Sequence, residues 1–303
     1  MTLTELRYVV AVARHRHFGK AAEACFVSQP TLSVAVRKLE EELGVRLFER
    51  SPNEVLVTDI GATIITQATE VLNAAEGVKE IAEAARDPLG RELKLGVIYT
   101  VGPYLVPRLI PGLKSLAPNM SLVVRENFTD ALAAQLKGGE LDAAIMSLPY
   151  VDPQLLSRPL YDEPFQVALP ADHPLAKKKR LAPADLAAET LLLLGARNCF
   201  RDQVIEICPV STRMGALQKT LEGSSLETIC QMVAMGAGVT ILPATMRIND
   251  DLAEHLVVRP FMAPQPTRTI AVFYRRGFAR PQVIQCLANV VRAAKLKGVD
   301  YCA

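Results

Sequence analysis

The fold of the N-terminal region is predicted by one stretch of sequence, residues 18–50, which reads FGKAAEACFVSQPTLSVAVRKLEEELGVRLFER. Ser28 is a typical helix N-cap, and Pro30 suits the first turn because a missing N–H loses no partner there. After them, apolar residues at helical spacing form one face, which consists of Leu32, Val36, Leu39 and Leu43. Gly44 is a typical helix end. The stretch therefore predicts a helix that begins after Ser28 and ends at Gly44.

Two shorter helices are predicted ahead of this one, over Thr4–Arg14 and Phe18–Cys25. A hairpin is predicted after it, from the apolar runs on either side of SPNE in LFERSPNEVLVTDIG, residues 47–61. Together these elements indicate a winged helix-turn-helix, whose second helix places side chains near base edges and phosphates in the major groove. The candidate DNA-binding residues are Ser28, Gln29, Pro30, Thr31, Ser33 and Arg37, with Arg50 at the hairpin for a phosphate contact.

The charge of the chain does not decide between DNA binding and a plain three-helix bundle with a solvated polar face. The formal net charge is +2, and residues 1–58 hold eight Lys and Arg against seven Glu. An excess of that size gives no argument for a nucleic acid partner. From the residues alone, both interpretations stay open.

Residues Ile60–Arg86 are predicted to form one long helix. Small or apolar residues recur along it in alternating steps of four and three, at Ile64, Ala68, Val71, Ala75, Val78, Ala82 and Ala85. The heptad seam indicates a helix that pairs in a dimer. Because most of its residues are alanine, the pairing would be weak alone and is expected to need support from other contacts. The helix is expected to end at DPLG, residues 87–90. The predicted domains are residues 1–59 for DNA binding, 60–88 for the linker and dimerisation, and 89–303 for an effector domain.

From Glu92 onward, predicted strands alternate with predicted helices. Strands are expected at 92–100, 122–127, 141–149, 165–169, 190–194, 239–243 and 269–276, and helices at 103–116, 130–139, 199–208, 224–238 and 281–295. This pattern indicates the α/β fold class, with two Rossmann-like subdomains in a bilobed effector domain like that of periplasmic binding proteins. A ligand cleft is expected where the carboxyl ends of strands meet helix N-termini.

Composition indicates a globular chain in a reducing compartment. Half of the residues are apolar and 22% are charged. No apolar run approaches the ~18–20 residues that span a bilayer, and the N-terminus starts an amphipathic helix rather than a signal peptide, so a cytoplasmic location without a membrane partner is expected. The six cysteines are then expected as free thiols. Their spacing fits neither CxxC nor a zinc site, and no phosphate-binding loop is present, so no metal or cofactor is expected.

Two cysteines lie nine positions apart in NCFRDQVIEIC, residues 198–208. The apolar residues of this segment fall on one face, which predicts a short helix with the two Cα atoms about 13–14 Å apart. A disulfide needs them within about 7 Å, so Cys199 and Cys208 can bond only if the helix unwinds. A helix N-terminus and Arg201 both favour the thiolate of Cys199, which makes it the attacking thiol. A redox switch and a pair of inert buried thiols stay open as alternatives.

The quoted N-terminal stretch resembles the DNA-binding signature of LysR-type transcriptional regulators. The remainder, including SLETICQMVAMGAGVTILP at 225–243, is similar to the linker helix and bilobed effector domain of that family. The resemblance implies a homodimer or a dimer-of-dimers tetramer that binds promoter DNA, contacts RNA polymerase and responds to a signal at the effector domain. It implies a regulator rather than an enzyme.

Within this family, NCFRDQVIEIC resembles the redox segment of the members that sense hydrogen peroxide. The resemblance implies that Cys199 is the peroxidatic cysteine and Cys208 the resolving one, joined in a reversible disulfide. It also implies an activator of oxidative-stress genes.

Four further residues correspond to the peroxide pocket of those members: Thr100, Thr129, Asn198 and Arg268. Asn198 departs from the family pattern, which has a histidine before the reactive cysteine. Asparagine can hydrogen-bond to peroxide or water but cannot exchange a proton near neutral pH. A proton-relay role at this position is therefore not expected.

Three alternatives compete with a peroxide-responsive regulator. The first is a LysR-type regulator of metabolism with a small organic effector in the cleft and inert cysteines. The second is a thiol peroxidase or disulfide reductase, which would leave the N-terminal motif unexplained. The third is a periplasmic solute-binding protein, which the bilobed half alone would allow.

Overall fold

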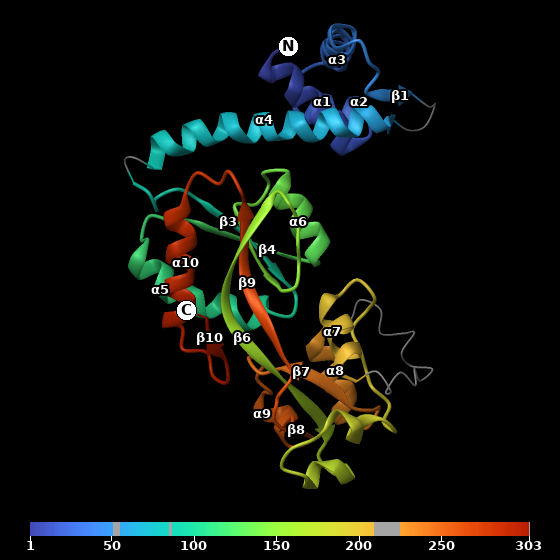
Figure 1. The fold of residues 1–303 in the computed structure, drawn as a ribbon, viewed down its shortest axis with the longest axis vertical. Coiled ribbons are helices and arrows are strands. Elements are labelled where there is room, and N and C mark those ends of the chain that lie inside the picture. Colours follow the sequence, from blue (N-terminus) through green and yellow to red (C-terminus); the bar gives the residue numbers. More distant parts are fainter. Residues whose placement is uncertain (51–54, 85–86, 209–224, 303) are drawn as a thin grey trace. The chain divides into compact units, whose positions relative to one another are not determined.

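The computed structural model in Figure 1 describes residues 1–50, 55–84, 87–208 and 225–302. The chain divides into two compact units, Met1–Arg86 and Asp87–Ala303. The first is a helical unit with a two-stranded hairpin, and the second is a mixed α/β unit.

The first unit has the predicted helix-turn-helix and hairpin. Its elements are α1 (Leu3–His15), α2 (Phe18–Ala24), α3 (Gln29–Leu43), β1 (Phe48–Arg50), β2 (Val55–Val57) and α4 (Asp59–Ala84). Strands β1 and β2 are antiparallel. Ser28 caps α3, because its Oγ accepts a hydrogen bond of 3.3 Å from the amide of Thr31, and Gly44 ends the helix with φ at +69°. The apolar face of α3 is buried in the core of this unit through Leu32, Val36 and Leu39.

Helix α4 confirms the predicted long helix and carries most of the predicted heptad seam. Ile64 and Ala68 pack into the core of the first unit. Val71 and Val78 further along are 39% and 68% exposed in the single chain. The last seam position, Ala85, lies outside the described residues. The C-terminal part of the seam thus presents apolar side chains that a second copy of the chain could cover.

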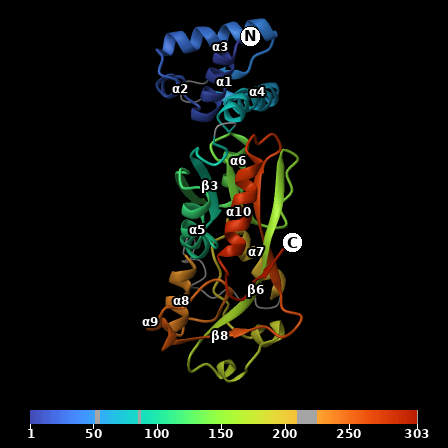
Figure 2. The same ribbon diagram turned by 90° about the vertical axis from the view of Figure 1, so that its left-hand side faces the viewer.

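The first lobe of the second unit is built on a six-stranded sheet. In spatial order its strands are β10 (Asp300–Tyr301), β6 (Leu155–Pro170), β9 (Thr267–Arg275), β5 (Ala143–Ser147), β3 (Leu93–Ile98) and β4 (Leu122–Asn127). Strand β3 is parallel to β4 and β5, whereas β9 is antiparallel to β5 and β6. Helices α5 (Gly102–Leu116) and α10 (Pro281–Ala293) pack side by side (Figure 2), and α6 (Thr129–Lys137) packs against β3 and β5.

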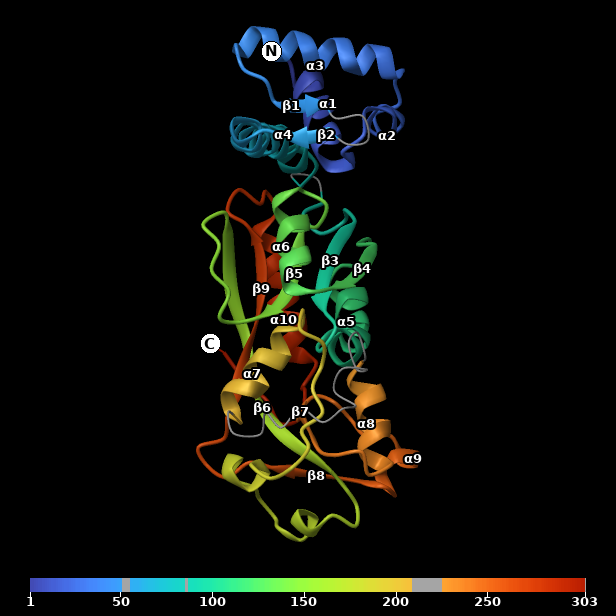
Figure 3. The ribbon, with the colours of Figure 1, turned by 90° about the vertical axis from the view of Figure 1, so that its right-hand side faces the viewer.

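The second lobe is built on the far half of β6, which from Phe165 onward pairs antiparallel with β7 (Thr240–Pro243) and β8 (Leu256–Pro260). Its helices are α7 (Cys199–Ile207), α8 (Leu226–Ala234) and α9 (Asp250–Ala253), with 3-10 turns η1 (Pro174–Lys177) and η2 (Pro183–Leu186). Each lobe has its own apolar core. The chain passes between the lobes along β6, as Figure 3 shows, and returns through residues 261–267. The predicted bilobed α/β architecture is confirmed.

Two strand predictions differ from the structure. The strand predicted over 190–194 is wrong, because these buried residues form only an isolated bridge between Leu191 and Val239. The strand predicted over 165–169 begins ten residues earlier, at Leu155. The added segment contains prolines and charged residues, which argue against a strand. It nevertheless pairs with β9, and a register shift between Pro159 and Tyr161 accommodates the irregularity. Among the described ranges, no helix is both long and apolar enough to cross a bilayer.

Candidate functional site

The two candidate redox cysteines lie at opposite ends of α7. Asn198 is the N-cap, and its Oδ1 accepts a hydrogen bond of 3.2 Å from the amide of Phe200. Cys199 is the first helical residue. Cys208 is the C-cap, and its amide still donates to the carbonyl of Val204 at 3.0 Å. The predicted helix is confirmed, and its rise places the two cysteine Cα atoms about 13–14 Å apart.

Both cysteines are free thiols, but their surroundings differ. Cys199 is half-buried and packs against the core of the first lobe. Cys208 is only 2% exposed and belongs to the core of the second lobe. Burial raises the pKa of the Cys208 thiol to about 11, because a low-dielectric core disfavours the thiolate. The helical arrangement keeps the two sulfur atoms in separate lobes and beyond disulfide reach.

Polar contacts attach α7 to the first lobe. Thr129, the first residue of α6, donates a hydrogen bond from Oγ1 to the Sγ of Cys199 at 3.4 Å. Gln203 lies four residues after Cys199 and hence on the same face of the helix. Its Nε2 donates to the Oγ of Ser147 at 2.9 Å and to the carbonyl of Leu148 at 3.2 Å, at the end of β5. One face of α7 is therefore bound to the first lobe, while its buried apolar residues belong to the second.

A buried ion pair lies where the chain passes between the lobes. Arg268 on β9 and Glu163 on β6 are 2.7 Å apart, and their side chains are 1% and 0% exposed. The guanidinium of Arg268 also donates to the Oγ1 of Thr100 at 2.9 Å and to its carbonyl at 3.0 Å. It lies over the ring of Phe200 at 4.9 Å. Arg268 thus fixes Thr100 and contacts the neighbour of Cys199 in α7.

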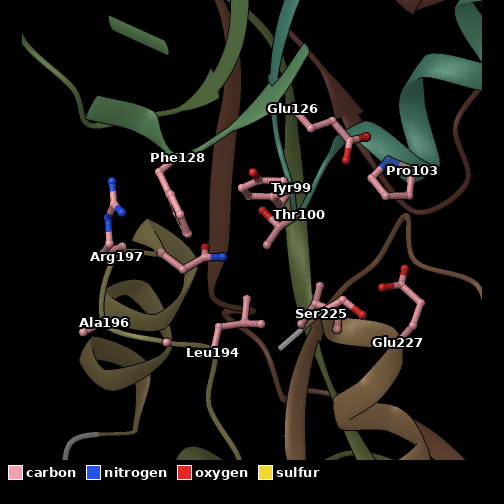
Figure 4. A pocket seen from close by; sticks show the side chains of 13 residues that line it. Tyr99, Thr100, Pro103, Glu126, Phe128, Leu194, Ala196, Arg197, Ser225 and Glu227 are labelled. Atoms are coloured by element: carbon pink, nitrogen blue, oxygen red, sulfur yellow. The ribbon is translucent and has the colours of Figure 1, made fainter. Parts of the chain in front are cut away.

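A cleft of about 550 Å³ opens between the two lobes, as Figure 4 shows. Its size is within the range of small-molecule sites. Tyr99, Thr100, Glu126 and Phe128 line it from the first lobe, and Leu194 to Asn198 and Ser225 to Glu227 line it from the second. Of the residues predicted for the peroxide pocket, Thr100 and Asn198 line this cleft. The other two do not line it: half-buried Thr129 contacts Cys199, and buried Arg268 contacts Thr100.

Two contacts cross the cleft. The guanidinium of Arg197 stacks on the ring of Phe128 at 4.7 Å, and Figure 4 shows the two side chains together. The hydroxyl of Tyr104 donates to a carboxylate oxygen of Glu227 at 2.6 Å. Burial and then this hydrogen bond raise the pKa of Tyr104. Partial burial and then repulsion from Glu227 raise the pKa of Glu126.

Several residues of this site are absent from the sequence prediction: Glu163, Arg197, Gln203 and Ser147. Each acts through a partner far away in sequence, such as the 105 residues that separate Arg268 from Glu163. The N-cap role of Asn198 could have been found, because asparagine before a short amphipathic helix is a common cap.

The predicted DNA-binding residues cluster around the start of α3. Gln29, Pro30, Thr31 and Arg37 are exposed, and Ser33 is half-buried. Ser28 is exposed but its Oγ is engaged with the amide and hydroxyl of Thr31, so its role here is that of a cap. Arg37 forms an exposed pair with Glu41 at 2.9 Å. Arg50 ends β1, and its side chain lies outside the described residues.

Comparison with known proteins agrees with this arrangement. Residues 3–62 match the family model of the bacterial regulatory helix-turn-helix protein, lysR family, and residues 86–295 match the LysR substrate binding domain. A DNA-binding helix-turn-helix unit followed by a bilobed effector unit defines a transcription regulator. The chain belongs to the LysR family of bacterial regulators.

Within this family, its relatives carry the name of one regulator. The chain is 41% identical over 293 residues to the hydrogen peroxide-inducible genes activator of Pectobacterium carotovorum, covering 96% of both chains. It is also 41% identical to the DNA-binding transcriptional dual regulator OxyR of Escherichia coli, covering 97% of this chain and 95% of that one.

Solved structures give the same result. A full-length OxyR from Pseudomonas aeruginosa, solved as a mutant, is 49% identical, with a TM-score of 0.81 over 98% of this chain and 96% of that one. A hydrogen peroxide-bound cysteine-to-serine mutant of Corynebacterium glutamicum OxyR is 33% identical, with a TM-score of 0.64 over 97% and 92% of the two chains. Family membership over both units contradicts the enzyme and the solute-binding alternatives, since neither explains the helix-turn-helix.

Proposed function

We propose that this regulator senses hydrogen peroxide through a reversible disulfide between Cys199 and Cys208 and activates oxidative-stress genes. The observation that carries the proposal is α7, which holds a half-buried thiol beside the hydroxyl of Thr129 at one end and a buried thiol at the other. The names of the relatives support the same signal.

The chemistry takes place in two steps. The thiolate of Cys199 attacks one oxygen of the peroxide, the O–O bond breaks, and the leaving hydroxide takes up a proton to give water and a sulfenic acid. The thiol of Cys208 then attacks the sulfenic sulfur, the S–O bond breaks, and a second water leaves as the disulfide forms. Two thiols are oxidised by two electrons, and one peroxide is reduced to two waters. A cellular dithiol then reduces the disulfide by thiol–disulfide exchange, which returns Cys199 and Cys208 to thiols while the dithiol becomes a disulfide.

The structure gives a reason for the order of these steps. A pKa of about 11 keeps Cys208 almost entirely in the thiol form at pH 7 while α7 is helical. Attack by Cys208 therefore follows the unwinding of the helix, which both exposes the thiol and brings it toward Cys199. The disulfide changes the structure of residues 199–208, and we infer that this changes how subunits pack and which DNA half-sites they contact.

Peroxide is held near Cys199 by the predicted pocket residues. Thr129 contacts the reactive sulfur, and Arg268 orients Thr100. Asn198 uses its side-chain oxygen to cap α7 but keeps its amide N–H donors for a peroxide oxygen. It supplies a hydrogen bond rather than a proton.

The remaining assignments follow the family architecture. Residues 1–59 bind promoter DNA through α3, residues 60–88 form the linker and dimerisation helix, and residues 89–303 form the effector domain. The exposed seam of α4 supports a homodimer. The dimer-of-dimers tetramer and the contact with RNA polymerase at the promoter are what the family resemblance implies. A regulator of promoter DNA acts in the cytoplasm of a bacterium.

The cleft between the lobes favours one second candidate function, the binding of a small organic effector. Its lining argues against an organic anion, because Glu126 and Glu227 face it while its arginine, Arg197, is stacked on Phe128. A change in DNA binding with a metabolite, without any response to peroxide, would favour this candidate.

The test is differential alkylation of the full-length protein, unfolded in denaturant for the labelling step so that buried thiols also react, with peptide mass mapping before and after equimolar peroxide, together with DNA footprints. We expect Cys199 and Cys208 alone to lose alkylation, and the footprint to change. Cys199→Ser and Cys208→Ser should each abolish the change in footprint, whereas Cys302→Ser, a half-exposed thiol outside α7, should retain it. Finding both thiols of α7 alkylated after peroxide would contradict the proposal.

A further inference from the structure

We propose that Gln203 is a positioning residue that holds α7 in its reduced position and thereby sets the potential of the switch. The inference rests on the proposed disulfide between Cys199 and Cys208. It assigns to Gln203 and its acceptors on β5 a task distinct from that of the peroxide pocket.

The polar contacts of Gln203 lie on the first lobe, as those of Cys199 do. Gln203 and Cys199 lie one turn apart on one face of α7, and both contact the first lobe. The two hydrogen bonds from Gln203 end on Ser147, which is 3% exposed, and on the carbonyl of Leu148. The Oγ of Ser147 is itself placed by contacts of 3.2 Å to that carbonyl and 3.5 Å to the carbonyl of Thr269. The acceptors thus belong to the sheet of the first lobe and do not move with α7.

Formation of the disulfide requires one end of α7 to move. The distance between the Cα atoms of Cys199 and Cys208 must fall from about 13–14 Å to about 7 Å or less, so at least one end of α7 must leave its site. Cys208, Phe200 and Val204 are buried in the second lobe. The end that moves is therefore the one held to the first lobe by polar contacts, and unwinding between residues 199 and 208 breaks the hydrogen bonds of Gln203.

The side-chain amide of Gln203 is only partly hydrogen-bonded in this position. The Oε1 of Gln203 is buried and accepts no hydrogen bond from the residues that the structure describes. A buried amide acceptor without a donor reduces the stability that the two donated bonds provide. The two hydrogen bonds donated by Gln203 thus stabilise the reduced position of α7, but the unpaired Oε1 lowers the free energy needed to break them.

The expected effect follows from these contacts. Loss of both hydrogen bonds from the reduced form alone should raise the equilibrium constant for disulfide formation about tenfold. For this two-electron couple, a tenfold change makes the reduction potential about 30 mV more negative. Loss of one acceptor should give about a threefold change, or about 15 mV.

The experiment uses the full-length protein, equilibrated in mixtures of reduced and oxidised dithiothreitol and then alkylated to measure the fraction of disulfide. The reduction potential should become about 30 mV more negative in Gln203→Ala and about 15 mV more negative in Ser147→Ala. The double variant should match Gln203→Ala, because the two residues share one contact. Glu206→Ala is the matched control, an exposed residue on the same helix, and should leave the potential unchanged.

The outcomes separate this inference from the proposed function. A wild-type protein that forms no disulfide overturns both. A wild-type disulfide with Gln203→Ala and Ser147→Ala within about 5 mV of it, or shifted to less negative values, overturns only the role of Gln203. If Gln203→Ala does not fold, Ser147→Ala decides alone. A general loss of stability would lower the melting temperature of the reduced and oxidised forms alike and leave the potential in place.

Discussion

Removal of the negative charge from Glu163 should destabilise the effector unit more than any surface charge change. Glu163 accepts from Arg268 on one oxygen and from the amide and hydroxyl of Thr245 on the other, and it is 0% exposed. In Glu163→Gln the carbonyl can still serve Thr245, but the new NH₂ group then faces the donors of Arg268. The arginine keeps its charge, because it does not deprotonate in proteins.

The size of this destabilisation follows from the burial of both Glu163 and Arg268. Removal of one partner of a buried ion pair costs about 3–5 kcal/mol, because the other charge stays buried without compensation. We expect about 4 kcal/mol for Glu163→Gln, which corresponds to a fall in melting temperature of about 8–16 °C for a unit of this size. The matched control is Lys178→Gln in the same unit, whose partner Asp185 lies 2.7 Å away in a pair that is 52% and 23% exposed. Such a pair contributes about 0–1 kcal/mol.

The assay is thermal unfolding of the reduced full-length protein, followed by calorimetry and by near-UV circular dichroism. The transition of the effector unit should move strongly in Glu163→Gln and by no more than about 4 °C in Lys178→Gln. Equal shifts in melting temperature would contradict this prediction, because they would mean that the buried pair stabilises the unit no more than an exposed pair does.

Three further predictions address the thiols and the DNA-binding unit. In the reduced, folded protein Cys208 should be alkylated far more slowly at neutral pH than in the unfolded protein, because the thiol is buried and its raised pKa of about 11 favours the protonated form; the difference should narrow as the pH rises toward that value. Ser28→Ala should destabilise the first unit by about 1 kcal/mol through loss of the α3 cap, measured by urea unfolding. Arg37→Ala should reduce the salt dependence of DNA binding by about one counterion, seen in titrations at several salt concentrations, whereas Lys79→Ala on the linker helix α4 should not.

Local signals account for what could be predicted from the sequence. The cap at Ser28, the stop at Gly44 and the apolar period between them act within one helix, so α3 is confirmed at both ends. The same holds for α7, where spacing alone placed the two cysteines beyond bonding distance. β6 was predicted at a third of its length, because Pro159 and Pro164 argue against a strand until β9 supplies the partner.

The residues that complete the site could not be predicted, because their interactions are made across the fold. Gln203 reads as a polar residue on the surface of a helix until α7 packs on the end of β5, which lies 55 residues earlier in the chain. Arg268 was singled out by resemblance to the peroxide-sensing members, but its partner Glu163 was not, since nothing in DEPFQVAL indicates a buried carboxylate. Arg197 and Phe128 likewise meet only when the two lobes face each other.

The arrangement of α7 determines which contacts of the effector unit the proposed disulfide would break. The polar contacts of its Cys199 face lie in the first lobe, through Thr129 and Ser147, and its apolar residues lie in the second. The proposed disulfide to Cys208 would transfer the first end of the helix to the second lobe, so the first lobe would lose those contacts. The ion pair of Arg268 and Glu163 lies on the strands that join the lobes and contains no atom of α7. It can persist in both redox states and keep the lobes joined while α7 changes, which confines the change to the surface that α7 and its neighbours form.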